Sequence, residues 1–174
     1  MIDKNKIKPG DILMFRIVKS SGLFGRLIGW FSLLTGNGGT YEKTYAHVAL
    51  VENVDYYLEQ TFPKSKRTKL DCNNPEMELW RINNLSRENA DKAIGWAKGN
   101  LGKWYNFRHL ITLGFIKGYG CSDFLFNAFY ESGTGIVLNK KGKGDPVCSP
   151  NEVIESGLLT CIDDGGHIAP KEKR

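Results

Sequence analysis

The chain has 174 residues, which suits one domain with a hydrophobic core and leaves little room for a second. It is 41% hydrophobic and 25% charged, and it lacks the run of about 18 apolar residues that predicts a membrane span. Much of the net charge of +5 lies in basic runs at 64–69, 140–143 and 171–174. We interpret these runs as solvated loops. Anionic lipid or cell wall stays open as a partner, but no nucleic-acid-binding motif accompanies the charge.

The cysteines and the N-terminus bear on the cellular compartment. Four cysteines, Cys72, Cys121, Cys148 and Cys161, form no C-x-x-C pair and no zinc spacing, so neither a metal nor an organic cofactor is implied. The polar residues 1–6 lack the apolar stretch of a signal peptide. We therefore expect a reducing compartment without a disulfide framework, for a protein that is either cytoplasmic or encoded by a virus. The oligomeric state is left open.

The first half of the chain predicts strands and one amphipathic helix. Pro9-Gly10-Asp11 predicts a turn before a buried strand. Residues 22–34 place leucines and aromatic residues at helical spacing; this helix either packs in the core or contacts lipid or a hydrophobic substrate. A turn at 53–55 predicts a hairpin, and the basic loop follows it. The predicted strands of this half are residues 12–16, 46–52 and 56–61.

The second half is mostly helical. Ser86 caps a helix at 87–101, with Ala90, Ala93, Ile94 and Ala97 on its buried face. Ser149, followed by proline and then by glutamate three residues on, is a strong helix start. The other predicted elements are a strand at 77–82, a helix at 122–132, a last strand at 158–162 and a loose tail at 163–174. This order predicts an α+β fold with an antiparallel sheet in a single domain, residues 1–174.

Cys121 is the strongest candidate for a chemical role. A glycine-bearing loop runs into this cysteine, and an apolar helical pattern follows at once. The thiol is therefore expected at the first turn of a helix, where unpaired N–H groups and the helix dipole favour thiolate. Cys72, Cys148 and Cys161 have no base at a suggestive spacing, and we interpret them as structural or incidental.

His47 and Glu59 are the candidate base and its orienting group. His47 lies in an otherwise apolar strand, where a hydrogen-bonded structural histidine is the alternative. With a turn near residue 54, Glu59 falls opposite Ala49 and diagonal to His47, on the same face of the sheet. A slip of one residue would reverse that face and make Glu59 a solvent-exposed edge residue. If the thiol and the imidazole meet, the chain is a cysteine hydrolase or acyltransferase.

The order of these motifs resembles the circularly permuted branch of the NlpC-type papain-like cysteine hydrolases, the YiiX/YebB-like group, and more distantly lecithin:retinol acyltransferase. The resemblance spans roughly residues 8–160. The segments that carry it are 9–13, the amphipathic helix before 45–50, then 58–60, 101–107 and 121–124. It implies a permuted papain-like fold in which an antiparallel sheet packs against helices.

Carried over by position, the resemblance implies that Cys121 is the nucleophile, His47 the base and Glu59 the third polar residue. Tyr105 matches a tyrosine near the nucleophile, which with Ser122 is assigned to oxyanion or substrate binding. Three positions depart from the usual pattern without removing a group of the triad. They are Ala46 where serine is common, Asn106 where aspartate is common, and Asp123 in place of glutamate.

The implied function is cleavage of an amide bond, in a peptide or a peptidoglycan-like substrate, through a thioester. A lipid acyl hydrolase or acyltransferase is the second alternative, and a non-catalytic binding or host-interaction protein on the same scaffold is the third. His109 is expected at a surface or hinge and His167 in the exposed tail. Neither is expected to take part in the chemistry.

Overall fold

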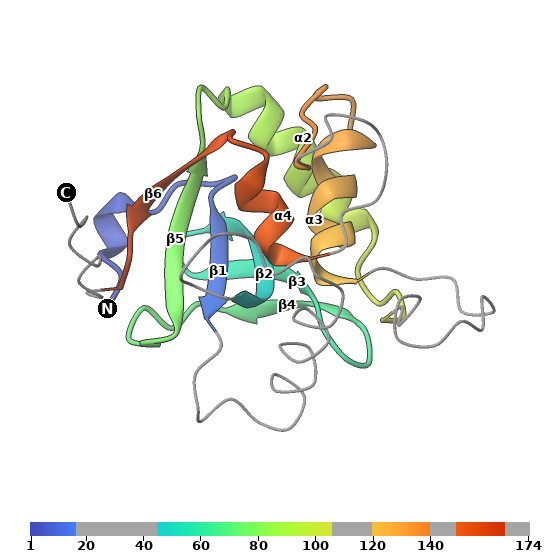
Figure 1. Ribbon diagram of the computed structural model, residues 1–174. Coiled ribbons are helices and arrows are strands. Elements are labelled where there is room, and N and C mark those ends of the chain that lie inside the picture. The colour runs from blue at the N-terminus through green and yellow to red at the C-terminus, as the bar shows by residue number, and fades with distance from the viewer. Residues whose placement is uncertain (17–44, 106–119, 140–148, 166–174) are drawn as a thin grey trace.

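The fold is seen in a computed structural model that describes residues 1–16, 45–105, 120–139 and 149–165 (Figure 1). In this part of the chain, six strands form one antiparallel sheet and three α-helices pack against it, which confirms the predicted α+β class. The strand order is β4-β3-β2-β1-β5-β6. The strands are β1 (Ile12–Arg16), β2 (Tyr45–Asn53), β3 (Tyr56–Gln60), β4 (Ser65–Lys69), β5 (Met77–Ile82) and β6 (Leu159–Asp163). The helices are the 3-10 helix η1 (Lys4–Lys6) and the α-helices α2 (Arg87–Gly99), α3 (Cys121–Tyr130) and α4 (Pro150–Glu155).

The predicted hairpin is confirmed. β2 and β3 pair antiparallel, with Leu50 opposite Leu58. In this register Glu59 follows opposite Ala49, as the sequence predicts. β1 lies between β2 and β5 in the middle of the sheet, and its first three residues are buried. A central strand with both faces covered needs apolar residues on both faces, which explains its apolar run.

The predicted basic loop at 64–69 is wrong. Residues 65–69 form β4, which pairs with β3 along its whole length and is an edge of the sheet. Its exposed side chains are Lys66, Arg67 and Lys69. Charged side chains are common on edge strands because they prevent pairing with another chain. The segment lacks the apolar alternation of an ordinary strand, so its sequence gives only a weak strand signal.

The helix starts follow the predicted caps. The Ser86 hydroxyl accepts the Asn89 N–H at 3.2 Å, and α2 ends at Gly99, two residues before the predicted end. Ser149 and Glu152 form the predicted capping box of α4. The predicted buried face of α2 is also confirmed, with Ala90, Ala93, Ile94 and Ala97 buried.

The turn before β1 joins the sheet to α2. Asp11 is buried and accepts two hydrogen bonds from the Arg81 side chain, at 2.7 and 2.8 Å. Gly10 has a φ of +89°, and a Cβ there would lie 2.7 Å from the Cβ of Ala90. Only glycine suits both the positive φ and this close approach to the helix.

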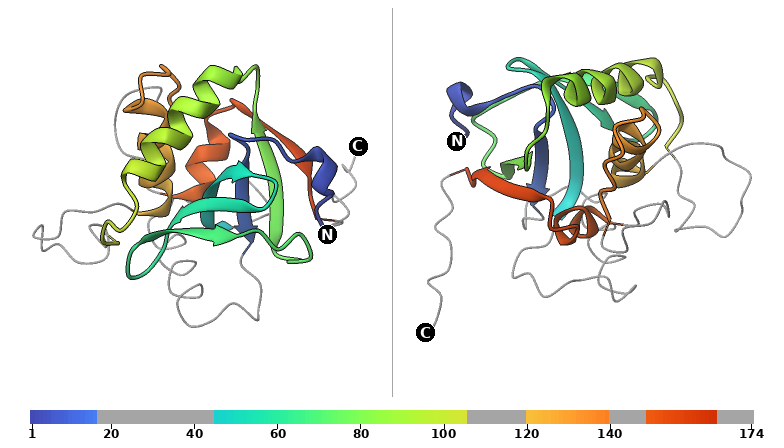
Figure 2. Two further views of the ribbon diagram at one scale, coloured as in Figure 1. Left: turned by 180° about the vertical axis from the view of Figure 1, so that it is seen from behind. Right: turned by 90° about the horizontal axis from the view of Figure 1, so that it is seen from above.

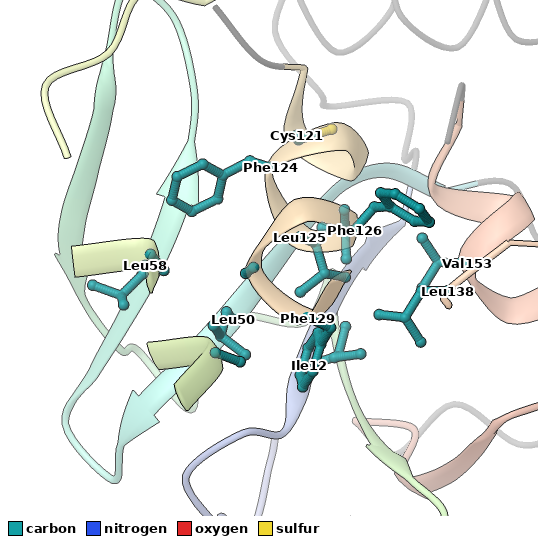
Figure 3. Packing of buried hydrophobic residues seen from close by; sticks show 14 of the residues in the cluster. Ile12, Leu50, Leu58, Cys121, Phe124, Leu125, Phe126, Phe129, Leu138 and Val153 are labelled. Carbon is teal, nitrogen blue, oxygen red and sulfur yellow. The ribbon is translucent and has the colours of Figure 1, made fainter. Parts of the chain in front are cut away.

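The three α-helices lie together on one side of the sheet (Figures 1 and 2). Alternate residues of β1 enter two clusters on opposite faces, so that Ile12 packs with the helices and Leu13 with the other cluster. Figure 3 shows the side chains of α3 packed between the strands and α4, with Cys121 at the start of the helix. The bulky residues of this packing are Phe124, Leu125, Phe126 and Phe129. The helix that carries Cys121 is therefore held in place by the core.

We expect Phe129→Ala to lower the free energy of unfolding by about 3–5 kcal/mol, because it leaves a cavity where a fully buried ring was. Urea denaturation measures the loss. Glu131→Ala, an exposed change just after the same helix, should stay within about 0.5 kcal/mol of the unchanged protein. An equal loss in the two variants would mean that the Phe129 ring does not anchor α3.

The N-terminal residues pack beside β6, at the end of the sheet away from the α-helices (Figure 1). The Lys6 ammonium lies 3.1 Å from the Asp163 carboxylate, and the Met1 amino group donates to the Gly165 carbonyl at 2.6 Å. The predicted loose tail therefore starts too early at 163, since Asp163 belongs to β6; residues 166–174 lie outside the described part. None of the helices in the described ranges is long and apolar enough for a membrane span.

Candidate active site

Cys121 is the first residue of α3, at the N-terminal end of the helix (Figure 3). Gly120 is the N-cap residue, and its N–H donates to the Asp123 carboxylate at 3.2 Å. The Cys121 side chain is buried. Because the first N–H groups of a helix have no partner within it, they are free to donate to an anion that forms beside the Cys121 side chain.

His47 is placed by an irregularity in β2. Phe15 pairs with His47, but the next residue, Arg16, pairs with Tyr45, so Ala46 is an extra residue in β2. Such a bulge twists a strand locally and changes the direction of a neighbouring side chain. The His47 ring packs against Phe15, with ring centroids 5.3 Å apart, and its side chain is 20% exposed.

Glu59 and His47 form the predicted hydrogen bond across the hairpin. The Glu59 Oε2 lies 2.7 Å from Nε2 of His47. The other carboxylate oxygen, Oε1, accepts the Thr68 hydroxyl at 2.6 Å and lies 3.6 Å from the Lys66 ammonium. His47 is also hydrogen-bonded to the Cys121 side chain. Since Nε2 faces Glu59, Nδ1 is the ring nitrogen left for Cys121.

The charges of the site stabilise one another. Burial by itself lowers the pKa of His47, but hydrogen bonds to Cys121 and Glu59 outweigh it and raise that pKa to about 10. Burial raises the pKa of Glu59, yet hydrogen bonds from His47 and Thr68 give a net lowering. An imidazolium between a carboxylate and a thiol is the state that these shifts favour.

Tyr105 reaches the site from the segment that follows α2. This segment runs beside the start of β4: the Tyr105 N–H donates to the Pro63 carbonyl at 2.9 Å, and the Ser65 N–H donates to the Lys103 carbonyl at 2.8 Å. Lys64 and Trp104 form an isolated β-bridge between the same two segments. Backbone bonds between segments distant in sequence thus fix Tyr105 beside α3.

The Tyr105 hydroxyl contacts Cys121 twice, through hydrogen bonds with its side chain and its backbone N–H. Burial, and then the charges of Cys121 and Asp123, raise the pKa of Tyr105 well above its ordinary value. The hydroxyl therefore keeps its proton and remains able to donate a hydrogen bond. The structure thus brings together Cys121, His47, Glu59 and Tyr105.

The structure describes only some of the remaining residues that the sequence singles out. Ser122 is buried on α3, and its role in substrate binding stays a prediction. Cys72 is buried and Cys161 is exposed, and burial raises the pKa of Cys72. The predictions for the 22–34 helix and for Asn106, His109, Cys148 and His167 fall on residues outside the described ranges.

Thr68 was missed by the sequence reasoning, although it contacts Glu59 directly. It lies on β4, where the sequence predicts a loop. The available signal is weak: Lys66 and Thr68 alternate with Arg67 in the way that residues on one face of a strand do. This spacing places Thr68 beside Glu59 only when β4 pairs with β3.

A search of protein-family models finds no match to the chain, and a search of curated proteins finds no similar sequence. Among solved structures, the chain is similar to the metalloprotein YiiX from Escherichia coli O157:H7, with a TM-score of 0.61 and 20% sequence identity. The superposition covers 90% of this chain and 97% of YiiX. The chain has a YiiX-like fold. At this level of identity, the similarity shows the fold and does not transfer an activity.

The description of YiiX as a metalloprotein raises the question of a metal in this chain. Within the described segments, no group of three or more His, Cys, Asp or Glu side chains is arranged to hold a metal ion. The Nε2 atom of His47 is already hydrogen-bonded to Glu59, and the His47 side chain also contacts Cys121. Among the described residues, the site therefore does not fit a metal centre.

Proposed function

We propose that this protein is a cysteine hydrolase that cleaves an amide bond, in a peptide or peptidoglycan-like substrate, through a thioester on Cys121. One observation carries the proposal: His47 is hydrogen-bonded to Cys121 and to Glu59 at the same time. A nucleophile, a base and an orienting group in contact are the requirements of covalent acyl transfer. The resemblance of the motif order to permuted NlpC-type papain-like hydrolases supports the proposal, and the YiiX-like fold is compatible with it.

In the first half of the proposed reaction, Cys121 attacks the acyl carbonyl. His47 holds the proton from the thiol as an imidazolium, and the sulfur forms a bond to the carbonyl carbon. Before the reaction, the Tyr105 hydroxyl accepts a hydrogen bond from the Cys121 N–H. When the oxyanion forms, this N–H donates to the oxyanion instead, and the Tyr105 hydroxyl donates a hydrogen bond to the same oxygen. The imidazolium then gives its proton to the leaving amine, the C–N bond breaks, and a thioester remains.

In the second half, His47 removes a proton from water, and the resulting hydroxide attacks the thioester. The C–S bond breaks, the acid product leaves, and sulfur and imidazole return to their starting charges. Throughout both halves, Glu59 holds the Nε2–H of His47 and stabilises its positive charge. The four residues of this scheme come from β2, β3, α3 and the segment after α2.

One observation favours the lipid alternative. Phe62 and Trp104 are 58% and 55% exposed, and they lie in the two segments that hold Tyr105. The Lys64 ammonium lies over the Trp104 ring, 4.6 Å from its centroid. Exposed aromatic and cationic side chains beside a site suit an acylated or anionic lipid substrate.

The experiment is to incubate the protein with peptidoglycan fragments and, separately, with phospholipid or acylated-peptide vesicles. Cys121→Ala removes the nucleophile, and Cys161→Ala is the matched control because its thiol is exposed and has no assigned role. We expect amide products from the unchanged protein and Cys161→Ala, and none from Cys121→Ala. Release of fatty acid that depends on Cys121, with muropeptides intact, would replace the amide proposal by the lipid one. If neither substrate gives a product that depends on Cys121, the protein is better described as a binding protein.

A further inference from the structure

Glu59 has two carboxylate oxygens, and the proposed reaction uses only one of them. Oε2 accepts from His47, whereas Oε1 accepts from Thr68 at 2.6 Å on the neighbouring strand. The Glu59 side chain is only 8% exposed, so solvent contributes little to its orientation. The position of this carboxylate is therefore set mainly by the groups that bond to its two ends.

The direction of the Thr68 proton follows from counting donors. An ionised carboxylate only accepts, so Thr68 must donate its single proton to Glu59. The result is a continuous series of contacts from Thr68 through Glu59 and His47 to Cys121.

The surroundings of Thr68 favour a fixed geometry. Tyr57 pairs with Thr68 across β3 and β4, and Phe15 packs against the rings of both Tyr57 and His47, at 5.9 and 5.3 Å. A β-branched side chain such as threonine has restricted χ1 rotamers. Lys66 also faces Glu59 Oε1, but at 3.6 Å from a 56% exposed, flexible side chain. Lys66 therefore adds a positive charge near Glu59 but does not fix the orientation of the Glu59 carboxylate.

We infer that Thr68 is a positioning residue, which holds Glu59 so that Oε2 faces Nε2 of His47 and Nδ1 faces Cys121. This inference rests on the proposed function, because it assigns Thr68 an effect on Cys121 through two other residues. It goes beyond the expected triad by adding a hydroxyl from an edge strand.

The test measures the rate of iodoacetamide labelling of Cys121 in the full chain between pH 5 and 9, read by mass spectrometry. Thr68→Val removes the hydroxyl and keeps the shape, and Thr68→Ser keeps the hydroxyl. We expect Thr68→Val to lower the labelling rate at pH 6 about tenfold, the effect of losing one hydrogen bond to a charged group. The rise of the labelling rate with pH should also move to higher pH. Thr68→Ser should stay within about twofold, since its hydroxyl still reaches Glu59.

Thr160→Val is the matched control. Thr160 also lies on an edge strand and donates to a side-chain oxygen, that of Asn83 at 2.6 Å, so it reports the effect of the substitution alone. Melting temperatures show that each variant is folded, and Thr68→Ala replaces Thr68→Val if the latter does not fold. A folded variant without the hydroxyl that keeps the unchanged rate and pH profile overturns the inference, as does an equal loss in Thr68→Ser. If the unchanged protein itself lacks labelling that depends on His47, the proposed function fails and the inference falls with it.

Discussion

His47→Ala should lower the labelling of Cys121 by iodoacetamide at pH 6 about a hundredfold, because a thiol without a charged partner ionises near pH 8.5 and is almost wholly protonated at pH 6. In the unchanged protein, the raised pKa of His47, about 10, keeps the imidazole protonated at this pH, and the charge stabilises thiolate. Alkylation followed by mass spectrometry measures the rate at each cysteine separately. We expect Cys121 to be modified before the other three thiols.

The other cysteines are internal controls for this prediction. Cys72 is buried and Cys161 exposed, and neither rate should change in His47→Ala. Glu59→Ala should lower the Cys121 rate less than His47→Ala, since the base remains and only its orientation is lost. If Cys121 is labelled as fast in His47→Ala as in the unchanged protein, the thiol does not depend on this imidazole.

The pH dependence follows from the directions of the two pKa shifts. The pKa of His47 is raised, so its contribution to stability is complete below its ordinary value and is lost as the pH rises through about 10. The pKa of Glu59 is lowered, so its contribution is present above its ordinary value and is lost on acidification. The charged pair is thus intact at pH 6. The dependence of Cys121 labelling on His47 should therefore be largest near pH 6 and should fall as the pH rises toward 10, where the imidazole loses its charge.

Tyr105→Phe should lower turnover of the cleaved substrate about a hundredfold, the usual effect of removing one donor to an oxyanion. The hydroxyl lies against the Cys121 side chain and N–H, where the oxyanion of a tetrahedral intermediate would form. Initial rates are measured on whichever substrate the Cys121-dependent assay identifies. The phenylalanine ring fills the same space, so the packing beside α3 should be kept.

Iodoacetamide labelling separates this role from a general loss of the site. Alkylation of sulfur forms no oxyanion, so Tyr105→Phe should lower the Cys121 labelling rate by no more than about tenfold, the effect of losing its one hydrogen bond to the Cys121 side chain, while turnover falls about a hundredfold. A parallel loss of both rates would mean that Tyr105 supports the thiol rather than the oxyanion. Unchanged turnover would remove Tyr105 from the proposed mechanism.

Local sequence patterns were sufficient to predict most helices and strands of the described part of the fold. The caps at Ser86 and Ser149 and the buried face of α2 depend only on residues within one helix. The hairpin of β2 and β3 has a short turn, so its register could be counted from the turn, and this placed Glu59 beside His47. β4 was not predicted because most of its residues are charged or polar. These residues form a strand because they pair with β3.

Local patterns in the chain were enough to place each candidate residue in its own element: Cys121 at a helix start, and His47 and Glu59 on one hairpin. How these elements meet depends on the tertiary structure. The extra residue at Ala46, the contact of Thr68 with Glu59 and the contact of Tyr105 with Cys121 all depend on pairing between segments distant in the chain. Short-range patterns carry the geometry of one helix or one turn, whereas the alignment of separate strands is set by packing over the whole sheet.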